Sequence, residues 1–175
     1  MVSGNYGILQ QAVVQYTLLN CREVTGVVIG IIGESCTGKS TVAEELAKRL
    51  DAKVFTGKEY MKQAKSEAEA KKAFAELLCA NEESGEHYIY VITEPEHIAF
   101  LPPKAFRILM TAELDVIKER FAQRLNTALP PPVAAMLESK HGMFDGIKHD
   151  LKIENAGKSI SEVCDSIVKT VSVNT

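Results

Sequence analysis

The stretch Gly33-Glu34-Ser35-Cys36-Thr37-Gly38-Lys39-Ser40 carries glycine, lysine and serine at every fixed position of the pattern G-x-x-x-x-G-K-[ST]. Residues 27–32 before it form a short β-branched apolar run, which predicts a buried parallel strand. Apolar residues after it recur at helical spacing, at Val42, Ala43, Leu46, Ala47 and Leu50. A strand, a glycine-rich turn and a helix in this order predict a site for a nucleoside triphosphate.

The residue types of this loop suit phosphate chemistry. Glycines allow backbone N–H groups to curve around phosphate oxygens, and the N-terminus of the following helix adds partial positive charge. Lys39 is expected to reach the β- and γ-phosphates, and the Ser40 hydroxyl to ligate Mg²⁺. Cys36 is at a variable position, where it is either an inert small residue or a modifiable thiol. We predict ATP and Mg²⁺ as cofactors, held by Gly33, Glu34, Ser35, Cys36, Thr37, Gly38, Lys39, Ser40 and Thr41.

Length and composition are those of one ordinary compact domain. The chain has 175 residues, 46% of them hydrophobic, and a formal net charge of -3. No basic excess points to nucleic acid or an anionic membrane, and no apolar run reaches the ~18 residues of a membrane span. The four cysteines lack the spacing of a zinc site or a disulfide framework. We expect a cytoplasmic protein that binds neither nucleic acid nor membrane.

The chain divides into an N-terminal extension and one domain. Residues 1–26 are rich in apolar residues and glutamine, without the basic start and long apolar centre of a secretory signal. They are interpreted as a short helix that packs on the domain or on a partner chain, and a homodimer formed through this segment is one possibility. A start-site artefact is the other, so the extension has no assigned role. Residues 27–175 form the predicted domain.

Strand and helix patterns alternate along the rest of the chain. Short apolar runs predict strands at 52–55, 88–93, 106–110 and 151–153, and periodic segments predict helices at 62–78, after an N-cap at Thr111, and after a capping box of Ser159 and Glu162. The prolines at 130–132 are expected to end the second of these helices. This alternation predicts a three-layer α/β/α domain with a parallel sheet of about five strands.

Three segments beyond the loop resemble the P-loop kinases related to nucleoside-monophosphate kinases, a family that includes cytidylate, adenylate, shikimate and dephospho-coenzyme A kinases. Residues 55–60, Phe-Thr-Gly-Lys-Glu-Tyr, are similar to the D-T-G-x-x-Y segment of cytidylate kinases. Residues 111–124 are similar to the helix that leads into the mobile lid. Residues 150–157, Asp-Leu-Lys-Ile-Glu-Asn-Ala-Gly, are similar to the D-x-x-I-x-N-x-G stretch of dephospho-coenzyme A and guanylate kinases. The resemblance spans residues 27–171 and implies a P-loop NTPase domain.

The resemblance also implies roles for particular residues. The acceptor would lie against Thr56, Gly57 and Tyr60, and Arg124 would close on the transferred phosphoryl group, with Arg120 one helical turn earlier as a weaker candidate. Asn155, Ala156 and Gly157 would pack beside the adenine of ATP. The implied activity is ATP-dependent phosphoryl transfer to a small acceptor, either a nucleotide or another metabolite.

The sequence also departs from the family. Cytidylate kinases have an acid at the position of Phe55, and many relatives have Asp where Thr93-Glu94-Pro95 ends the third strand. Glu94 is expected to hold a Mg²⁺-bound water, or to act as the base if the acceptor is a hydroxyl. His97, three residues further, is expected at the surface.

The expected lid, residues 127–146, contains no arginine. Phosphoryl transfer depends on charge stabilisation of the moving group, so missing lid arginines affect turnover more than ATP binding. A nucleotide-binding module with little or no turnover is therefore the alternative to a kinase.

Overall fold

The computed structural model of the protein describes residues 26–154 and 159–174. The strands are β1 (Val28–Ile32), β2 (Ala52–Thr56), β3 (His87–Ile92), β4 (Phe106–Thr111) and β5 (Leu151–Glu154). The helices are α2 (Lys39–Leu50), α3 (Glu67–Cys79), α4 (Asn81–Ser84), α5 (Leu114–Leu125), α6 (Pro131–Lys140) and α7 (Ile160–Asn174), with the 3-10 helices η1 (Glu59–Gln63) and η2 (Pro95–Phe100). The expected extension, 1–26, lies outside the described residues apart from its last position.

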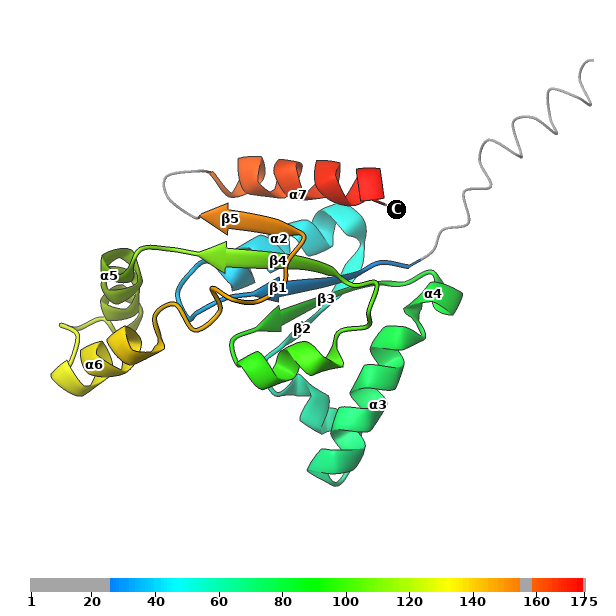
Figure 1. The fold of residues 1–175 in the computed structure, drawn as a ribbon, viewed down its shortest axis with the longest axis horizontal. Coiled ribbons are helices and arrows are strands. Elements are labelled where there is room, and N and C mark those ends of the chain that lie inside the picture. The colour runs from blue at the N-terminus through cyan, green and yellow to red at the C-terminus, as the bar shows by residue number, and fades with distance from the viewer. Residues whose placement is uncertain (1–25, 155–158, 175) are drawn as a thin grey trace, which may run out of the picture.

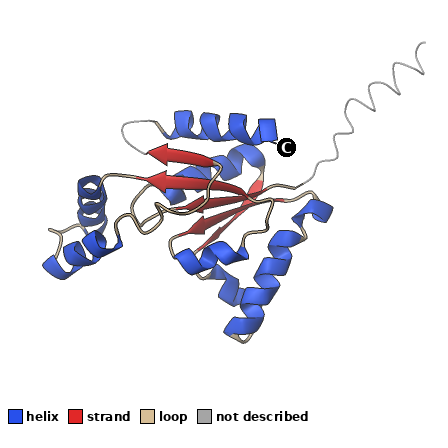
Figure 2. Ribbon diagram, viewed as in Figure 1, coloured by secondary structure: helices blue, strands red, loops and turns tan. Residues whose placement is uncertain are grey.

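The five strands form one parallel sheet in the order β2-β3-β1-β4-β5 (Figure 2). The strand β1 is central: it pairs with β3 from Val28 to Ile32 and with β4 from Ile29 to Ile32. All five residues of β1 are buried. In open parallel sheets, ligands bind at the carboxyl edge where the strand order reverses, and here that point is the end of β1. The predicted parallel sheet of about five strands is confirmed.

Helices cover both faces of the sheet, as Figure 1 shows. On one face α2 and α7 bury a core that includes Ile31, Leu46, Ile108 and Ile167. On the other face α3, η1 and η2 bury a second core rich in aromatic side chains, including Tyr60, Phe74, Tyr90 and Phe100. These are the three layers that the alternation of elements predicted.

The pair α5 and α6 lies beyond the carboxyl ends of the strands (Figure 1). The two helices bury a small separate cluster that includes Ala112, Ile117 and Leu137. The helix α6 was not predicted. The prediction that the prolines end α5 was wrong: α5 ends at Leu125, where Asn126 adopts a left-handed conformation as the C-cap. Pro131 instead starts α6, because proline is tolerated in the first turn of a helix, where its missing N–H is not needed.

Two predicted helix starts were wrong. The segment 62–78 divides into η1 and α3, because Ser66 caps α3: its Oγ accepts from the Glu69 N–H at 3.3 Å and donates to the Glu69 carboxylate at 2.8 Å. Thr111 belongs to β4, and the N-cap of α5 is Glu113, which makes no side-chain cap. In contrast, the capping box of Ser159 and Glu162 at α7 is confirmed.

None of the helices in the described ranges is long and apolar enough to cross a membrane.

Candidate functional site

The phosphate loop leaves β1 and enters α2 in a conformation that its glycines make possible. Gly33 has φ 154° and Gly38 has φ 95°. A Cβ on Gly33 would lie 2.2 Å from the Met110 carbonyl oxygen, so the end of β4 leaves room for glycine alone. The Gly33 N–H donates to the Ile92 carbonyl at 3.2 Å, which ties the start of the loop to the end of β3.

Cys36 also has a positive φ, 63°, which is unusual for a residue with a side chain. Its backbone conformation helps the loop to curve, and its half-buried side chain packs against the α5–α6 cluster. Packing suits an inert residue at Cys36, and its partial exposure suits a modifiable thiol.

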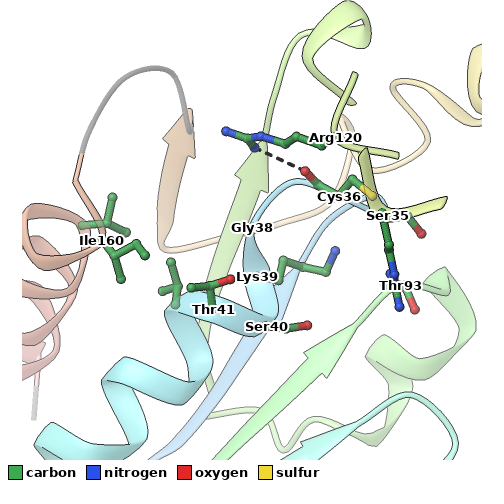
Figure 3. Close-up of a pocket in the computed structure, with 12 residues that line it drawn as sticks. Ser35, Cys36, Gly38, Lys39, Ser40, Thr41, Thr93, Arg120 and Ile160 are labelled. Atoms are coloured by element: carbon green, nitrogen blue, oxygen red, sulfur yellow. Dashed lines mark hydrogen bonds between the residues drawn. The ribbon is translucent and has the colours of Figure 1, made fainter. Parts of the chain in front are cut away.

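Lys39 lies under the loop rather than in solvent (Figure 3). Its Nζ donates to the Glu34 carbonyl and lies 3.4 Å from the Thr37 Oγ1, which itself donates to the same carbonyl at 2.9 Å. Burial lowers the pKa of Lys39 from 10.5 to about 8, partly offset by the nearby Cys36 and Glu34. The amine is held where the loop curves, and a bound anion there would favour its charged form.

The N-terminus of α2 opens toward the loop. Its N-cap, Gly38, makes no side-chain cap, and no acidic residue occupies the first turn. The unpaired N–H groups and the helix dipole therefore attract an anion. Ser40 and Thr41 are exposed at this end, as a metal-ligating hydroxyl at Ser40 requires. Mg²⁺ takes only one or two protein ligands when phosphates supply others, so this site fits MgATP.

A cavity of about 480 Å³ lies directly over the loop. Four parts of the fold line it: the loop with the start of α2, the end of β3, α5 and α7. Its lining residues are Ser35, Cys36, Gly38, Lys39, Ser40, Thr41, Val42, Thr93, Arg120, Arg124, Ile160 and Val163. The loop and both candidate arginines therefore share one cavity.

The two arginines of α5 differ in their contacts. Arg120 is half-buried, and its guanidinium donates to the Cys36 carbonyl at 3.2 Å (Figure 3). Arg124 is exposed and lines the same cavity one turn further along. Sequence reasoning placed Arg124 first because it is nearer the lid, and it had no signal for the contact of Arg120 with the loop.

Glu34 joins the loop to the segment that follows α6. Its carboxylate accepts from the Gly142 N–H at 2.7 Å and lies 3.1 Å from the His141 Nδ1. The side chain is mostly buried, with 15% exposed. Sequence reasoning counted Glu34 only as a loop residue, because nothing in the sequence pairs it with a position more than one hundred residues away.

The predicted acceptor residues lie where β2 ends, and each already has a partner. Thr56 donates through its N–H and hydroxyl to the Glu59 carboxylate, at 2.6 and 3.0 Å. The Gly57 carbonyl accepts from the Tyr90 hydroxyl at 3.0 Å. Tyr60 is buried, and its ring packs on aromatic neighbours. Thr56 is exposed, whereas Tyr60 is buried in the aromatic core.

Glu94 and His97 lie together just past β3. The His97 Nε2 is 3.5 Å from the Glu94 Oε2. The expectation that His97 is a surface residue was wrong: it is 2% exposed, because Tyr60, Tyr90 and Phe100 enclose its ring.

The predicted adenine loop has no structural outcome. Asn155, Ala156 and Gly157, the predicted adenine loop, lie outside the described residues. The described ranges hold no group of three His, Cys, Asp or Glu side chains that could bind a metal by itself. A metal held by Ser40 and phosphate oxygens needs no such group.

No family model and no curated protein sequence matches the chain. Solved structures do. They include a shikimate kinase from Aquifex aeolicus, with 22% identity over 85% of this chain and 98% of that chain and a TM-score of 0.54. The fold is that of the P-loop kinases.

Two other solved structures support the same assignment of fold. A sugar kinase from Janibacter sp. has 12% identity over 84% of this chain and 95% of that chain, with a TM-score of 0.60. The YorR protein of Bacillus subtilis, solved with phosphorylated GDP, has 19% identity over 84% of this chain and 96% of that chain, with a TM-score of 0.60. At these identities the P-loop kinase fold is shared, and the activity has to be argued from the site.

Proposed function

We propose that this protein transfers a phosphoryl group from ATP to a small acceptor, a nucleotide or another metabolite. One observation carries the proposal: a single cavity brings together the phosphate loop, the buried Lys39 amine and the two arginines of α5. A site that only holds nucleotide needs the loop, whereas arginines that arrive from a separate helix suit charge that develops during transfer.

Each site residue has a proposed role in this reaction. Lys39 neutralises the β- and γ-phosphates, and the Ser40 hydroxyl holds Mg²⁺. Glu94 orients a water of that metal or accepts a proton from the acceptor. Arg124 meets the transferred group, and Asn155, Ala156 and Gly157 pack beside the adenine. Bound Mg²⁺ would neutralise phosphate charge, and the residues of this chain would orient the reactants.

The acceptor is proposed to lie over the ends of β2 and β3, beside Thr56 and Gly57. The likeness of residues 55–60 to cytidylate kinases supports this position but does not identify the acceptor. Phe55 replaces the acid of those enzymes, so their acceptor chemistry does not transfer to this chain.

A nucleotide-binding module with little turnover is the second candidate. The observation that favours it is the composition of residues 127–146, which hold α6 and no arginine. In that case Arg120 would support the loop through the Cys36 carbonyl and would not act on phosphate.

Release of ADP, measured with and without a panel of acceptors, tests the proposal. We expect one acceptor class to stimulate release and Lys39→Ala to abolish it together with most ATP binding by calorimetry. Lys48→Ala is the matched control, because Lys48 is on the same helix but 76% exposed and pairs with Glu45. ATP binding without stimulation by any acceptor would favour the module, and unchanged ATP binding in Lys39→Ala would contradict the site itself.

A further inference from the structure

His97 is a polar side chain in an apolar, aromatic setting. Its ring stacks on Phe100, with centroids 5.4 Å apart and planes at 23°, and meets the edge of Tyr60 at 5.4 Å. The Nδ1 atom is buried and has no hydrogen-bond partner among the described residues. A buried polar atom without a partner costs about 1–3 kcal/mol. A phenylalanine would fill the same place without that cost, so packing alone does not explain an imidazole here.

The His97 side chain approaches the carboxylate of Glu94, with 3.5 Å between Nε2 and Oε2. The ring of His97 is fixed on several sides, whereas the Glu94 side chain is 45% exposed. An enclosed imidazole beside a partly exposed carboxylate restricts where the carboxylate points. We therefore treat His97 as a positioning residue for Glu94.

Glu94 lies between β3 and η2, at the edge of the sheet where the phosphate loop begins. The strand β3 is the neighbour of β1, and the hydrogen bond from Gly33 to Ile92 keeps its end beside the phosphate loop. Thr93, the residue before Glu94, lines the cavity over the loop. The acid at the corresponding end of β2 is Glu59, and its carboxylate is already held by the Thr56 N–H and hydroxyl at 2.6 and 3.0 Å and by Lys62 at 3.2 Å. Glu94 is thus the carboxylate that leaves the sheet next to the loop.

The charges around the proposed acceptor position indicate which acceptors suit it. Arginine is the side chain best shaped to hold phosphate or carboxylate. No arginine occurs in residues 50–106 or 125–175, which include the ends of β2 and β3 and the segment 127–146. The lysines after β2 are near carboxylates: Lys62 is 3.2 Å from Glu59, and Lys58 helps to lower the pKa of Glu67, an effect that comes mainly from Lys71. An anionic acceptor would find little unpaired positive charge there.

We propose that the acceptor is an uncharged hydroxyl compound, such as a sugar or polyol, and that Glu94, positioned by His97, accepts its proton. This rests on the proposed phosphoryl transfer. The acceptor O–H proton passes to the Glu94 carboxylate, and the oxygen forms a bond to the γ-phosphorus. The bond between that phosphorus and the β–γ bridging oxygen breaks, and ADP leaves with the electron pair. A nucleoside monophosphate, in contrast, has an acceptor oxygen that is already deprotonated and needs no base. Its negative charge would also favour a site with arginines.

A charge-sorted acceptor screen tests the substrate class. A bacterial metabolite extract is separated by anion exchange into an unbound fraction, uncharged or cationic, and a bound anionic fraction. Transfer of label from [γ-³²P]ATP to a new compound is then measured with each fraction. Label transfer with the unbound fraction is the expected result. Transfer with the anionic fraction alone would overturn this inference and leave the proposed function standing, whereas transfer with neither would overturn both.

Three variants test the roles of the two residues on the fraction or compound that accepts label. Glu94→Gln should reduce the transfer rate about 100-fold, in line with the loss of a general base. His97→Phe keeps the ring packing and should reduce the rate about 10-fold, with ATP affinity unchanged and Tm unchanged or higher. His97→Gln restores a side-chain N–H and should retain more activity than His97→Phe.

The matched control is Glu96→Gln, since Glu96 is an exposed acid two residues from Glu94 and is expected to keep the wild-type rate. Wild-type turnover in His97→Phe would show that His97 is only structural, and wild-type turnover in Glu94→Gln would overturn the assignment of the base. Glu94 is partly exposed, so its variant tests the assignment even if His97→Phe fails to fold.

Discussion

Lys39 is a buried amine whose pKa is close to the pH of most assays. Burial lowers its pKa to about 8, whereas an exposed lysine keeps a value near 10.4. The unfolded chain therefore binds this proton up to a higher pH than the folded chain does. By linkage, the folded state gains stability from this group as pH rises from about 8 to about 10.5, and below that window the charged amine lowers stability.

Nucleotide binding should reverse this shift, because phosphates favour the charged amine. We expect ATP binding at pH 9 to take up close to one proton and binding at pH 7 to take up almost none through this group. Calorimetry in two buffers of different ionisation enthalpy measures the uptake. Because Lys39 variants are expected to lose most ATP binding, the wild type carries this test, and Lys48→Met should show the same pH pattern as the wild type. Equal uptake at pH 7 and pH 9 would contradict the assignment.

The two arginines of α5 should affect different steps. Arg124→Ala is expected to lose on the order of 10³-fold in transfer rate with ATP affinity changed only a few-fold, because a group that meets phosphate in the transition state adds little to ground-state binding. Arg120→Ala removes the contact to the Cys36 carbonyl and should weaken ATP binding as well. Single-turnover rates and ATP titrations separate the two effects. Wild-type turnover in Arg124→Ala would favour the nucleotide-binding module.

How far the sequence predicts the site depends on whether the residues are contiguous. The loop could be predicted because its residues are consecutive and each has a fixed chemical reason. The contacts of Glu34 with Gly142 and of Arg120 with Cys36 join positions far apart, which no local pattern encodes. The burial of His97 was missed for the same reason, since a polar residue near acids is expected in solvent until aromatic side chains from η1 and β3 enclose it.

At the scale of elements, α7 depends on its N-terminal cap. The Ser159 Oγ accepts from the Glu162 N–H at 3.3 Å, and the Glu162 carboxylate accepts from the Ser159 N–H at 2.9 Å. Ser159→Ala should lower the free energy of unfolding by about 1 kcal/mol. Chemical denaturation measures it. Ser166→Ala, in the interior of the same helix, should stay within about 0.5 kcal/mol of wild type, and an equal loss in both would argue against the cap.

The elements that sequence reasoning placed well are those with strong local signals. The strands have continuous apolar runs, and α7 has both a cap and helical periodicity. The start of α6 was missed because prolines are expected to end a helix, whereas here they begin one. The division between η1 and α3 depends on which of several polar residues acts as the cap, and that choice is made by packing on the sheet.

At the scale of the whole molecule, β1 must fit between two layers. A Cβ on Gly30 would lie 2.4 Å from a methyl group of Leu101, which follows η2 on the aromatic face of the sheet. Gly30→Ala should therefore lower the free energy of unfolding by about 1–3 kcal/mol. The double variant with Leu101→Ala should lose less than the sum of the two single losses, as a double-mutant cycle by denaturation would measure. Additive losses would show that the two sites do not contact each other.

The central position of β1 has a consequence for how the chain is made. Both of its hydrogen-bonding partners come late: β3 begins at His87 and β4 at Phe106. At usual rates of synthesis, the strand waits on the order of 10 s after leaving the ribosome before β4 has emerged. During that time an apolar strand has two unpaired edges, which favour aggregation. The nascent chain therefore needs protection at residues 28–32, the strand that leads into the phosphate loop.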